Sequence, residues 1–377
     1  MTHLNLLSFD EFDAILVSAQ HRLATRLYTL DRLFATKKLN LFGYGGKGRS
    51  LASHIASGSG IEIGVYDSNA KARHMAEKDG FKIFNTLTEL QQSDDGIILG
   101  ACQAQIEQAH LVGQNYIFYQ EAAYFFDTPH LAHKSRELSI FILENKKSLY
   151  KLYSSLHPQS RSILTSILSF RLSLDPHDLI AVRKANVDMW FDVLEQYSYR
   201  DYLSFLDIGA YNGDTLQQAQ RRLSVTRGVA VEANTSLFNS ITDVAQAFSG
   251  GVRIVAQAAW SHKCRLHFSE VRGGMINVSE ADDGELEAAP LDAVIDEKID
   301  LIKIDIEGAE IPAFLGCPRL LSTGPDLAIA AYHVPDDLIK IPALLEESGY
   351  TQANFDLHVA HYSDCFDDTI LYYLKIQ

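Results

Sequence analysis

The residues that decide the fold are Phe205-Leu206-Asp207-Ile208-Gly209-Ala210-Tyr211-Asn212-Gly213-Asp214-Thr215. Apolar residues over 203–208 predict a strand, the glycines that follow predict a tight turn, and a helix is expected after it. Residues 228–231 predict a second strand, which Glu232 ends, 25 positions after Asp207 (232 − 207). A strand, a glycine turn, a helix and a second strand ending in an acid form the layout of a nucleotide-binding βαβ unit.

The side chains around this turn are acidic. Asp207 and Asp214 flank it, and no lysine or arginine stands beside it in the sequence. A diphosphate placed here would meet like charge, whereas a ligand with ammonium and sulfonium groups would be attracted. Glu232 is expected to accept hydrogen bonds from both hydroxyls of a ribose. The turn therefore predicts an adenosine-like ligand with a cationic tail and no diphosphate.

Outward from the turn, predicted strands and predicted helices alternate over residues 190–377. The further predicted strands are 252–257, 265–268, 301–304, 327–332 and 369–374. Such alternation predicts a mostly parallel, doubly wound sheet. We therefore expect one domain over residues 190–377.

A second glycine turn lies near the N-terminus. Gly43-Tyr44-Gly45-Gly46-Lys47-Gly48 follows a predicted strand at 39–42, and Asp67 ends the next strand 24 positions after Gly43 (67 − 43). This layout is typical of a dinucleotide site, because glycines let the backbone approach a pyrophosphate. The pattern also occurs in turns that only join a strand to a helix, so both interpretations stay open. The candidate residues are Gly43, Gly45, Gly48 and Asp67.

The rest of the N-terminal half divides into two parts. Residues 8–36 predict a long helix that starts at a capping box of Ser8 and Glu11. With the strands that follow, it forms a predicted Rossmann-like domain over residues 1–127, and 128–189 show no strand pattern and predict a helical bridge. The predicted fold class is α/β, with two Rossmann-like doubly wound domains.

Composition argues against several classes of protein. The 377 residues carry a formal net charge of −15, which repels nucleic-acid backbones, so we predict no nucleic-acid partner. No apolar run approaches the roughly 20 residues that span a bilayer, and acids stand where a secretion signal would be basic. The four cysteines are scattered, as reduced thiols usually are; they are Cys102, Cys264, Cys317 and Cys365. We expect a cytoplasmic protein that is not bound to a membrane.

Several motifs of the C-terminal part resemble the FkbM family of methyltransferases. Besides 205–215, the motifs are 231–234, 290–292, 302–310, 331–338, 361–363 and 368–372, of which 302–310 is the most specific. The resemblance covers roughly Ser155 to Gln377. Ala233 stands where the family more often has proline, which changes no chemistry. More loosely, residues 39–127 resemble the Rossmann-like domains of proteins that modify sugars or nucleotide sugars.

The resemblance implies a class I methyltransferase fold with S-adenosyl-L-methionine as cofactor, and methyl transfer to hydroxyls of sugars or polyketide-like natural products. The predicted cofactor-binding residues stand in the turn and at the strand ends beside it. They are Asp207, Gly209, Ala210, Tyr211, Gly213, Asp214, Thr215, Glu232, Asn234, Ala258 and Ala259. Asn234 and the two alanines are the expected neighbours of adenine.

Acids and histidines after the later strands are the predicted catalytic residues. Asp305 and Glu307 follow a buried strand, and ligands of open α/β sheets bind at the carboxyl ends of strands. His333 and His361 also lie at strand ends, and histidine can take a hydroxyl proton near neutral pH. Each has a structural alternative, because Lys303 or helix amides could satisfy the acids and either histidine could be a core residue. Such ligands would suit a divalent ion, but no metal is predicted.

Three functions compete at this point. The leading hypothesis is an S-adenosylmethionine-dependent O-methyltransferase whose partner is a small-molecule or glycan acceptor. The second is an NAD- or nucleotide-sugar-binding oxidoreductase or sugar-modifying enzyme that uses Gly43–Gly48, although no Tyr-x-x-x-Lys pair accompanies that turn. The third is a non-catalytic adaptor that keeps both folds. The sequence also leaves a homodimer open.

Overall fold

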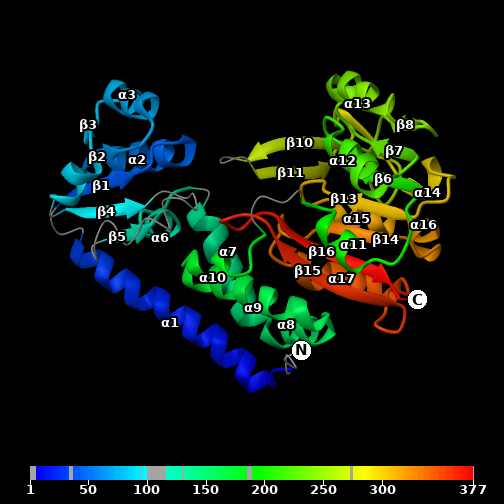
Figure 1. The fold of residues 1–377 in the computed structure, drawn as a ribbon, viewed down its shortest axis with the longest axis horizontal. Helices are drawn as coiled ribbons and strands as arrows, with labels where there is room; N and C mark the ends of the chain where they lie inside the picture. Colours follow the sequence, from blue (N-terminus) through cyan, green and yellow to red (C-terminus); the bar gives the residue numbers. More distant parts are fainter. Residues whose placement is uncertain are drawn as a thin grey trace.

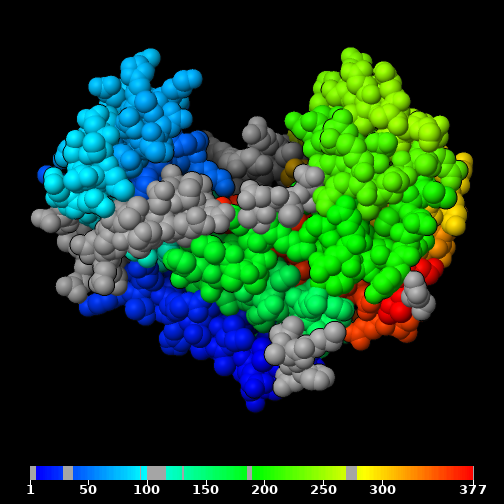
Figure 2. All heavy atoms as spheres, in the orientation of Figure 1, coloured from blue at the N-terminus to red at the C-terminus, as the bar shows by residue number. Residues whose placement is uncertain are grey.

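The computed structural model describes residues 6–33, 37–93, 95–99, 116–129, 131–184, 189–271 and 275–376. Its elements form two lobes. Helices join the lobes on one side of the molecule, and the lobes are separated on the other side (Figure 1). The space-filling view shows a hollow between the lobes (Figure 2). Among the described residues, no helix is both long and apolar enough to cross a membrane.

The N-terminal lobe contains a five-stranded sheet of order β3-β2-β1-β4-β5. All four strand pairings are parallel. The strands are β1 (Lys38–Phe42), β2 (Glu62–Tyr66), β3 (Lys82–Ile83), β4 (Gly96–Leu99) and β5 (Tyr116–Phe118). The helices are α2 (Gly46–Ser59), α3 (Ala70–Lys78), α4 (Leu87–Gln91) and α6 (Tyr119–Phe125).

A layer of helices joins the two lobes. It consists of α1 (Phe9–Leu33), α7 (Leu131–Glu144), α8 (Lys146–Ser155), α9 (Pro158–Ser173) and α10 (His177–Ile180). The predicted capping box is present at the start of α1, where the Ser8 amide donates to Glu11 Oε2 at 2.7 Å. Residues 34–36 of the predicted first helix lie outside the described residues, as does Cys102.

Packing links α1 to the C-terminal half of the molecule. Phe12, Leu16 and Ala19 belong to the same buried core as α9 and the C-terminal sheet. Leu27, further along α1, contacts the core of the N-terminal lobe as well. The first half of α1 therefore packs with the helical bridge, although the predicted boundary at residue 127 groups it with the N-terminal domain. The domain limits themselves stay a prediction.

The C-terminal lobe contains a seven-stranded sheet of order β15-β16-β14-β13-β6-β7-β8. The five strands from β14 to β8 are parallel, and β16 is antiparallel to both of its neighbours. The strands are β6 (Ser204–Ile208), β7 (Arg227–Val231), β8 (Val252–Val255), β13 (Leu301–Ile304), β14 (Asp326–Ala330), β15 (Phe355–His361) and β16 (Thr369–Lys375). The helices are α11 (Asp192–Tyr197), α12 (Asp214–Leu223), η3 (Thr235–Leu237), α13 (Phe238–Ala245), α14 (Leu291–Val294), α15 (Glu310–Leu315), α16 (Pro318–Ser322) and α17 (Asp337–Glu347).

A four-stranded sheet of order β11-β10-β12-β9 adds to this lobe. Its strands are β9 (Ala258–Ala259), β10 (Cys264–Val271), β11 (Met275–Glu280) and β12 (Leu286–Ala289). β10 and β11 pair antiparallel and extend toward the N-terminal lobe (Figure 1). We call these two strands the β10–β11 arm. The sequence predicts only residues 265–268 of it.

Both lobes begin with the same βαβ arrangement, but the residues beneath the glycine turns differ. Leu41 and Asp207 each stand two positions before the first glycine of their turn. On the neighbouring strand, Leu41 lies beside Ile98, whereas Asp207 lies beside Lys303. All four residues are buried. The predicted α/β fold class is confirmed, and only the C-terminal turn has a charged pair beneath it.

Candidate active site

The turn after β6 depends on glycine at its first position. Gly209 has a φ of 77°, and a Cβ atom there would lie 2.0 Å from the carbonyl oxygen of Asp305. No other residue fits this space, because the approach is to backbone rather than to a flexible side chain. The close contact sets the ends of β6 and β13 side by side. Gly213, with a φ of 85°, then leads into α12.

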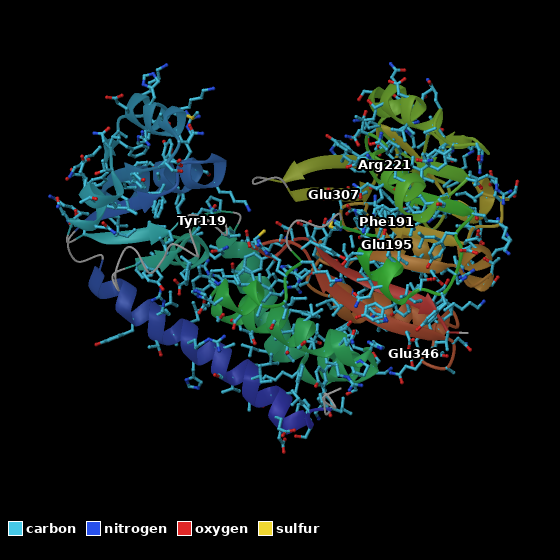
Figure 3. The ribbon with its side chains drawn as sticks, in the orientation of Figure 1. Tyr119, Phe191, Glu195, Arg221, Glu307 and Glu346 are labelled. Carbon is cyan, nitrogen blue, oxygen red and sulfur yellow. The ribbon has the colours of Figure 1, made fainter. Side chains whose placement is uncertain are left out.

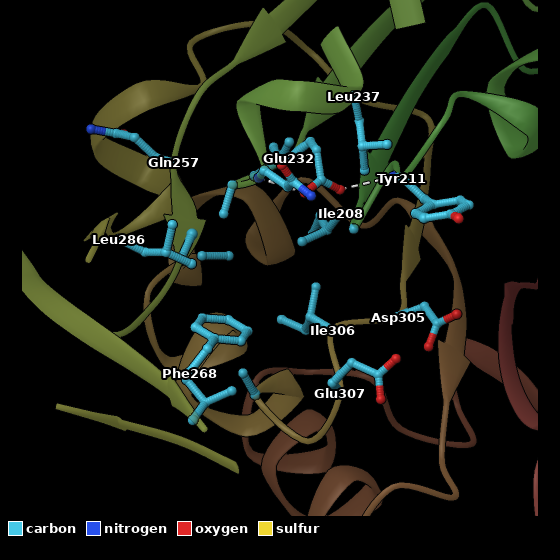
Figure 4. A pocket seen from close by; sticks show the side chains of 18 of the residues that line it. Ile208, Tyr211, Glu232, Leu237, Gln257, Phe268, Leu286, Asp305, Ile306 and Glu307 are labelled. Atoms are coloured by element: carbon cyan, nitrogen blue, oxygen red, sulfur yellow. Dashed lines mark hydrogen bonds between the residues drawn. The ribbon is translucent and has the colours of Figure 1, made fainter. Parts of the chain in front are cut away.

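Glu232 connects the turn to the end of β7. Its Oε2 accepts a hydrogen bond from the Tyr211 amide at 2.8 Å, and its Oε1 accepts one from the Asn234 amide at 2.7 Å. Asn234 Oδ1 in turn accepts from the Ser236 amide at 3.1 Å. The carboxylate is therefore held in place while it lines the cavity beside the turn (Figure 4).

Asp207 lies under the turn instead of on the cavity wall. It is fully buried, and Lys303 Nζ lies 3.0 Å from its Oδ1 and donates to the Gly209 carbonyl at 2.7 Å. Burial raises the pKa of Asp207 to about 6, against the lowering effect of Lys303. The expectation that two aspartates face the ligand with no cation nearby is therefore wrong for Asp207. Its charge is paired from below by a lysine that is distant in the sequence.

A cavity of about 750 Å³ opens beside the turn. Eight of the predicted cofactor-binding residues line it: Gly209, Tyr211, Asp214, Thr215, Glu232, Asn234, Ala258 and Ala259. The predicted acids Asp305 and Glu307 line it as well. Asp207, Ala210 and Gly213 are not among its lining residues. One cavity therefore unites the turn with the acids that follow β13 (Figure 4).

Apolar side chains that the sequence analysis did not select complete the wall. Phe268 and Val278 come from the β10–β11 arm, and Leu286 comes from β12. Leu237 and Ile306 add apolar surface nearer the turn (Figure 4). Alternating apolar residues in β10 and β11 could have indicated a half-buried hairpin, but nothing in the sequence places that hairpin over this cavity.

The charge of the cavity is acidic. The carboxylates that line it are those of Asp214, Glu232, Glu285, Asp305 and Glu307. Lys303 is the one basic residue among the lining residues that the structure describes, and it already contacts Asp207. The lining is therefore acidic although Asp207 is paired with Lys303. This lining attracts a positively charged ligand and repels phosphates.

An imidazole and three carboxylates meet at the end of the cavity. His333 Nδ1 lies 2.9 Å from Glu310 Oε1, and His333 Nε2 lies 3.3 Å from Asp305 Oδ1 and 3.7 Å from Glu307 Oε2. Burial lowers the pKa of His333, but Glu310 and Asp305 raise it to about 9. Burial also raises the pKa of Glu307. Glu310 is fully buried and was not among the predicted site residues.

His361 does not join this group. It ends β15, is buried, and its Nδ1 lies 3.0 Å from Thr369 Oγ1. Burial and the Arg171 guanidinium lower its pKa to about 3. It is not among the residues that line the cavity. The structure therefore brings together Asp305, Glu307 and His333 but leaves His361 in the core.

Three residues that line the cavity have backbone conformations that non-glycine residues rarely adopt. Trp190 has a φ of 91°, Tyr211 of 47° and Glu307 of 58°. Such conformations cost roughly 1–3 kcal/mol each and are often found at functional sites. Glu307 lies on the side of the C-terminal lobe that faces the hollow between the lobes (Figure 3).

The N-terminal turn has similar internal hydrogen bonds. Asp67 Oδ2 accepts from the Tyr44 amide at 2.7 Å, and Asp67 Oδ1 accepts from the Asn69 amide at 2.8 Å. The turn borders a separate cavity of about 690 Å³. Gly43, Gly45, Gly48 and Asp67, the four predicted residues, all line it.

The other side of this second cavity belongs to the loop between β15 and β16. That loop contributes Asp364, Asp367 and Asp368, and Arg183 forms an ion pair with Asp364. Four carboxylates, with Asp67, therefore line the space in front of the turn, together with the cations Lys47 and Arg183. The carboxylates outnumber the cations, which disfavours a dinucleotide there. The dinucleotide interpretation of the N-terminal turn stays a prediction.

Comparison with known proteins agrees with the C-terminal site. Residues 207–351 match the model of the methyltransferase FkbM domain. No curated protein matches the chain by sequence. Among solved structures, methyltransferase FkbM from Methylobacillus flagellatus KT is similar, with a TM-score of 0.75 and 19% identity over 97% of this chain and 100% of that chain.

A precorrin-6y C5,15-methyltransferase from Geobacter metallireducens GS-15 aligns with 48% of this chain and 83% of its own, at 18% identity and a TM-score of 0.30. The similarity to the Methylobacillus protein extends over both lobes and shows a shared fold. The match to the family model starts at Asp207 and runs through the acids after β13. Residues 207–351 of this chain therefore match the methyltransferase FkbM domain.

Proposed function

We propose that this chain is an S-adenosylmethionine-dependent O-methyltransferase that acts on a hydroxyl of a sugar, a glycan or a related natural-product metabolite. One observation carries the proposal: a single cavity of about 750 Å³ contains both the glycine turn with Glu232 and the acids Asp305 and Glu307. The volume lies in the range of small-molecule sites, roughly 300–1,000 Å³.

The residues of the cavity fit the cofactor. Glu232 can accept from ribose hydroxyls, and Asn234 and Ala258 lie on the wall where adenine would be placed. The surrounding carboxylates suit the ammonium and sulfonium groups, and the one lysine is paired with Asp207. When bound, S-adenosylmethionine supplies a methyl group on a sulfonium, which an acceptor oxygen attacks in line.

The acids after β13 would serve the acceptor. Glu307 is about half exposed and lines the cavity, so its carboxylate can take the proton that the hydroxyl loses. His333 is mostly buried, and its Nε2 lies 3.3 Å from Asp305 Oδ1. We therefore assign His333 to the positioning of Asp305. The products are the methyl ether, S-adenosylhomocysteine and a proton on Glu307.

Calorimetry on the full chain tests the cofactor. We expect S-adenosylmethionine and S-adenosylhomocysteine to bind with micromolar Kd and NAD to give no heat. If neither compound binds to folded protein, the proposal is wrong. Incubation with labelled cofactor and a panel of glycosides, followed by mass spectrometry, then tests the acceptor. Label on nitrogen or carbon instead of oxygen would contradict O-methylation.

A further inference from the structure

The group at the end of the cavity contains more negative charge than its histidine can balance. Glu310 is fully buried, Asp305 and Glu307 are partly exposed, and all three carboxylates face His333. Even a protonated imidazole offsets only one of the three charges. No lysine or arginine forms an ion pair with these acids among the residues that the structure describes. A further positive partner would stabilise carboxylates that are held together in this way.

One carboxyl oxygen of Glu310 has no partner within the described part of the structure. Its Oε1 accepts from the Ile306 amide at 2.9 Å and contacts His333 Nδ1. Its Oε2 is buried and has no hydrogen-bond partner. A buried carboxyl oxygen without a hydrogen-bond partner costs free energy that a protein normally avoids. The missing partner of this oxygen does not depend on the number of charges in the group, and it indicates a cation or another bound group.

The distances suit a metal ion. One ligand atom from each of Asp305, Glu310 and His333 lies within 4.8 Å of the other two. His333 Nε2 and Asp305 Oδ1 are 3.3 Å apart, close to the roughly 3 Å that separates two adjacent ligands each about 2.1 Å from a metal.

The geometry points to a divalent-cation site formed by Asp305, Glu310 and His333, at the acceptor end of the cavity. Its mixture of carboxylate and imidazole ligands fits Mn²⁺ or a similar ion. Asp305 and His333 follow the adjacent parallel strands β13 and β14, so the sheet itself brings them together. The sequence shows that carboxylate and imidazole ligands here would suit a divalent ion, but it predicts no metal and does not single out Glu310.

The consequence for catalysis rests on the proposed function. A cation at this position would bind the acceptor oxygen and lower the pKa of its hydroxyl. Glu307, 3.7 Å from His333 Nε2 on the open side, would then receive the proton. His333 would act as a ligand and not as a base.

Titration of the metal-free full chain with Mn²⁺, followed by electron paramagnetic resonance, tests the site without any methyl donor or acceptor. We expect one Mn²⁺ per chain, and a nitrogen coupling from an imidazole ligand in the electron spin-echo signal. Asp305→Asn should weaken binding at least tenfold, and His333→Gln should remove the nitrogen coupling. Circular dichroism of each variant checks that it is folded.

A second group of side chains provides the matched control. His262, Cys264 and Glu280, on and beside the β10–β11 arm, also have ligand atoms within 4.8 Å of one another. Cys264→Ser should leave Mn²⁺ binding unchanged. Loss of binding in Cys264→Ser, unchanged binding in Asp305→Asn, or no Mn²⁺ bound to the natural chain would each overturn the site. Calorimetry with S-adenosylmethionine is separate, so failure of the metal site and failure of the proposed function are distinguishable.

Discussion

The two glycine turns of this molecule have the same pattern of hydrogen bonds but lie in different surroundings. In each, a carboxylate at the end of the second strand accepts from an amide of the turn and from the amide two positions further on: Asp67 from Tyr44 and Asn69, and Glu232 from Tyr211 and Asn234. Above the turns, one cavity is walled by the β10–β11 arm and the other by an acidic loop.

The residues beneath the turns show the difference most clearly. The N-terminal turn rests on Leu41 and Ile98, and the C-terminal turn rests on Asp207 and Lys303 at the corresponding positions. The N-terminal turn therefore rests on an apolar pair, and the C-terminal turn rests on a charged pair. A buried ion pair is costly for stability alone, so its presence indicates that the C-terminal turn needs the Lys303 bond to the Gly209 carbonyl. Motif similarity alone would have given both turns one function.

The largest expected effect comes from Lys303→Met. Removal of the amine leaves Asp207 buried without its partner, which should lower the free energy of unfolding by about 3–5 kcal/mol. Urea denaturation measures it. Lys340→Met is the control, since Lys340 forms an exposed pair with Asp336 that should contribute at most about 1 kcal/mol.

A double variant sharpens this test. Asp207→Leu with Lys303→Met places an apolar pair beneath the C-terminal turn, as Leu41 and Ile98 lie beneath the N-terminal turn. This double variant should recover most of the lost stability. We expect S-adenosylmethionine binding to stay weak, because the Gly209 carbonyl loses its lysine. Full binding by the double variant would show that the ion pair is structural only.

The next effect comes from Gly209→Ala. The new Cβ would lie 2.0 Å from the Asp305 carbonyl oxygen at a positive φ, so we expect a loss of about 3 kcal/mol in stability and no detectable cofactor binding. Gly45→Ala is the matched change in the other turn, where φ is −72° and no atom lies within 4 Å of the new Cβ. Thermal unfolding and calorimetry measure both. Equal effects at the two turns would remove the distinction between them.

Acid should destabilise the C-terminal lobe through His358. Burial, with His157 and Lys184, lowers the pKa of this side chain to about 3, against about 6.5 in the unfolded chain. The stabilising contribution of its neutral form is complete above pH 6.5 and is lost as pH falls toward 3. The loss is about 2 kcal/mol at pH 5, by proton linkage.

Urea denaturation at pH 7 and pH 5, followed by fluorescence of Trp190 and Trp260, measures this loss in the C-terminal lobe. His358→Phe keeps the stacking on His157 and Tyr197 and should reduce the pH dependence by about 2 kcal/mol. The exposed His262→Phe is the control. An unchanged dependence in His358→Phe would contradict the assignment.

The smallest effect is expected from Glu232→Gln. The amide keeps one acceptor oxygen but loses the charge, so the Kd for S-adenosylmethionine should rise about tenfold, or about 1.4 kcal/mol. Asp67→Asn is its counterpart in the N-terminal lobe and should leave that Kd unchanged. A larger effect at Asp67 than at Glu232 would reverse the roles that we give to the two turns.

The parts of the site that could be predicted lie close together in the sequence. The turn after β6, Glu232 and the acids after β13 each belong to a short motif whose local pattern identifies it. Lys303 was weighed only as a structural partner for the acids after β13. Its contact with Asp207 depends on the β6–β13 register, which joins residues 96 positions apart (303 − 207).

The same reason explains the missed elements. β15 was not predicted because buried polar residues, His358 and His361, interrupt its apolar pattern. The full β10–β11 arm and Glu310 were not predicted as parts of the site, because their roles depend on contacts made only in the folded chain. The arm lines the cavity, and Glu310 contacts His333. His361 was selected for its residue type, whereas its burial separates it from the cavity.

The shared core of α1 and the helical bridge has a consequence for biosynthesis. The Leu7 amide donates to the Tyr153 hydroxyl 146 positions later, and the His157 amide donates to the Leu357 carbonyl. During synthesis α1 therefore waits for its partners α8 and α9, and those wait for β15, while the N-terminal sheet between α1 and α8 can fold first. A nascent chain of this protein carries an amphipathic helix without its partners through much of translation, which is when chaperones act.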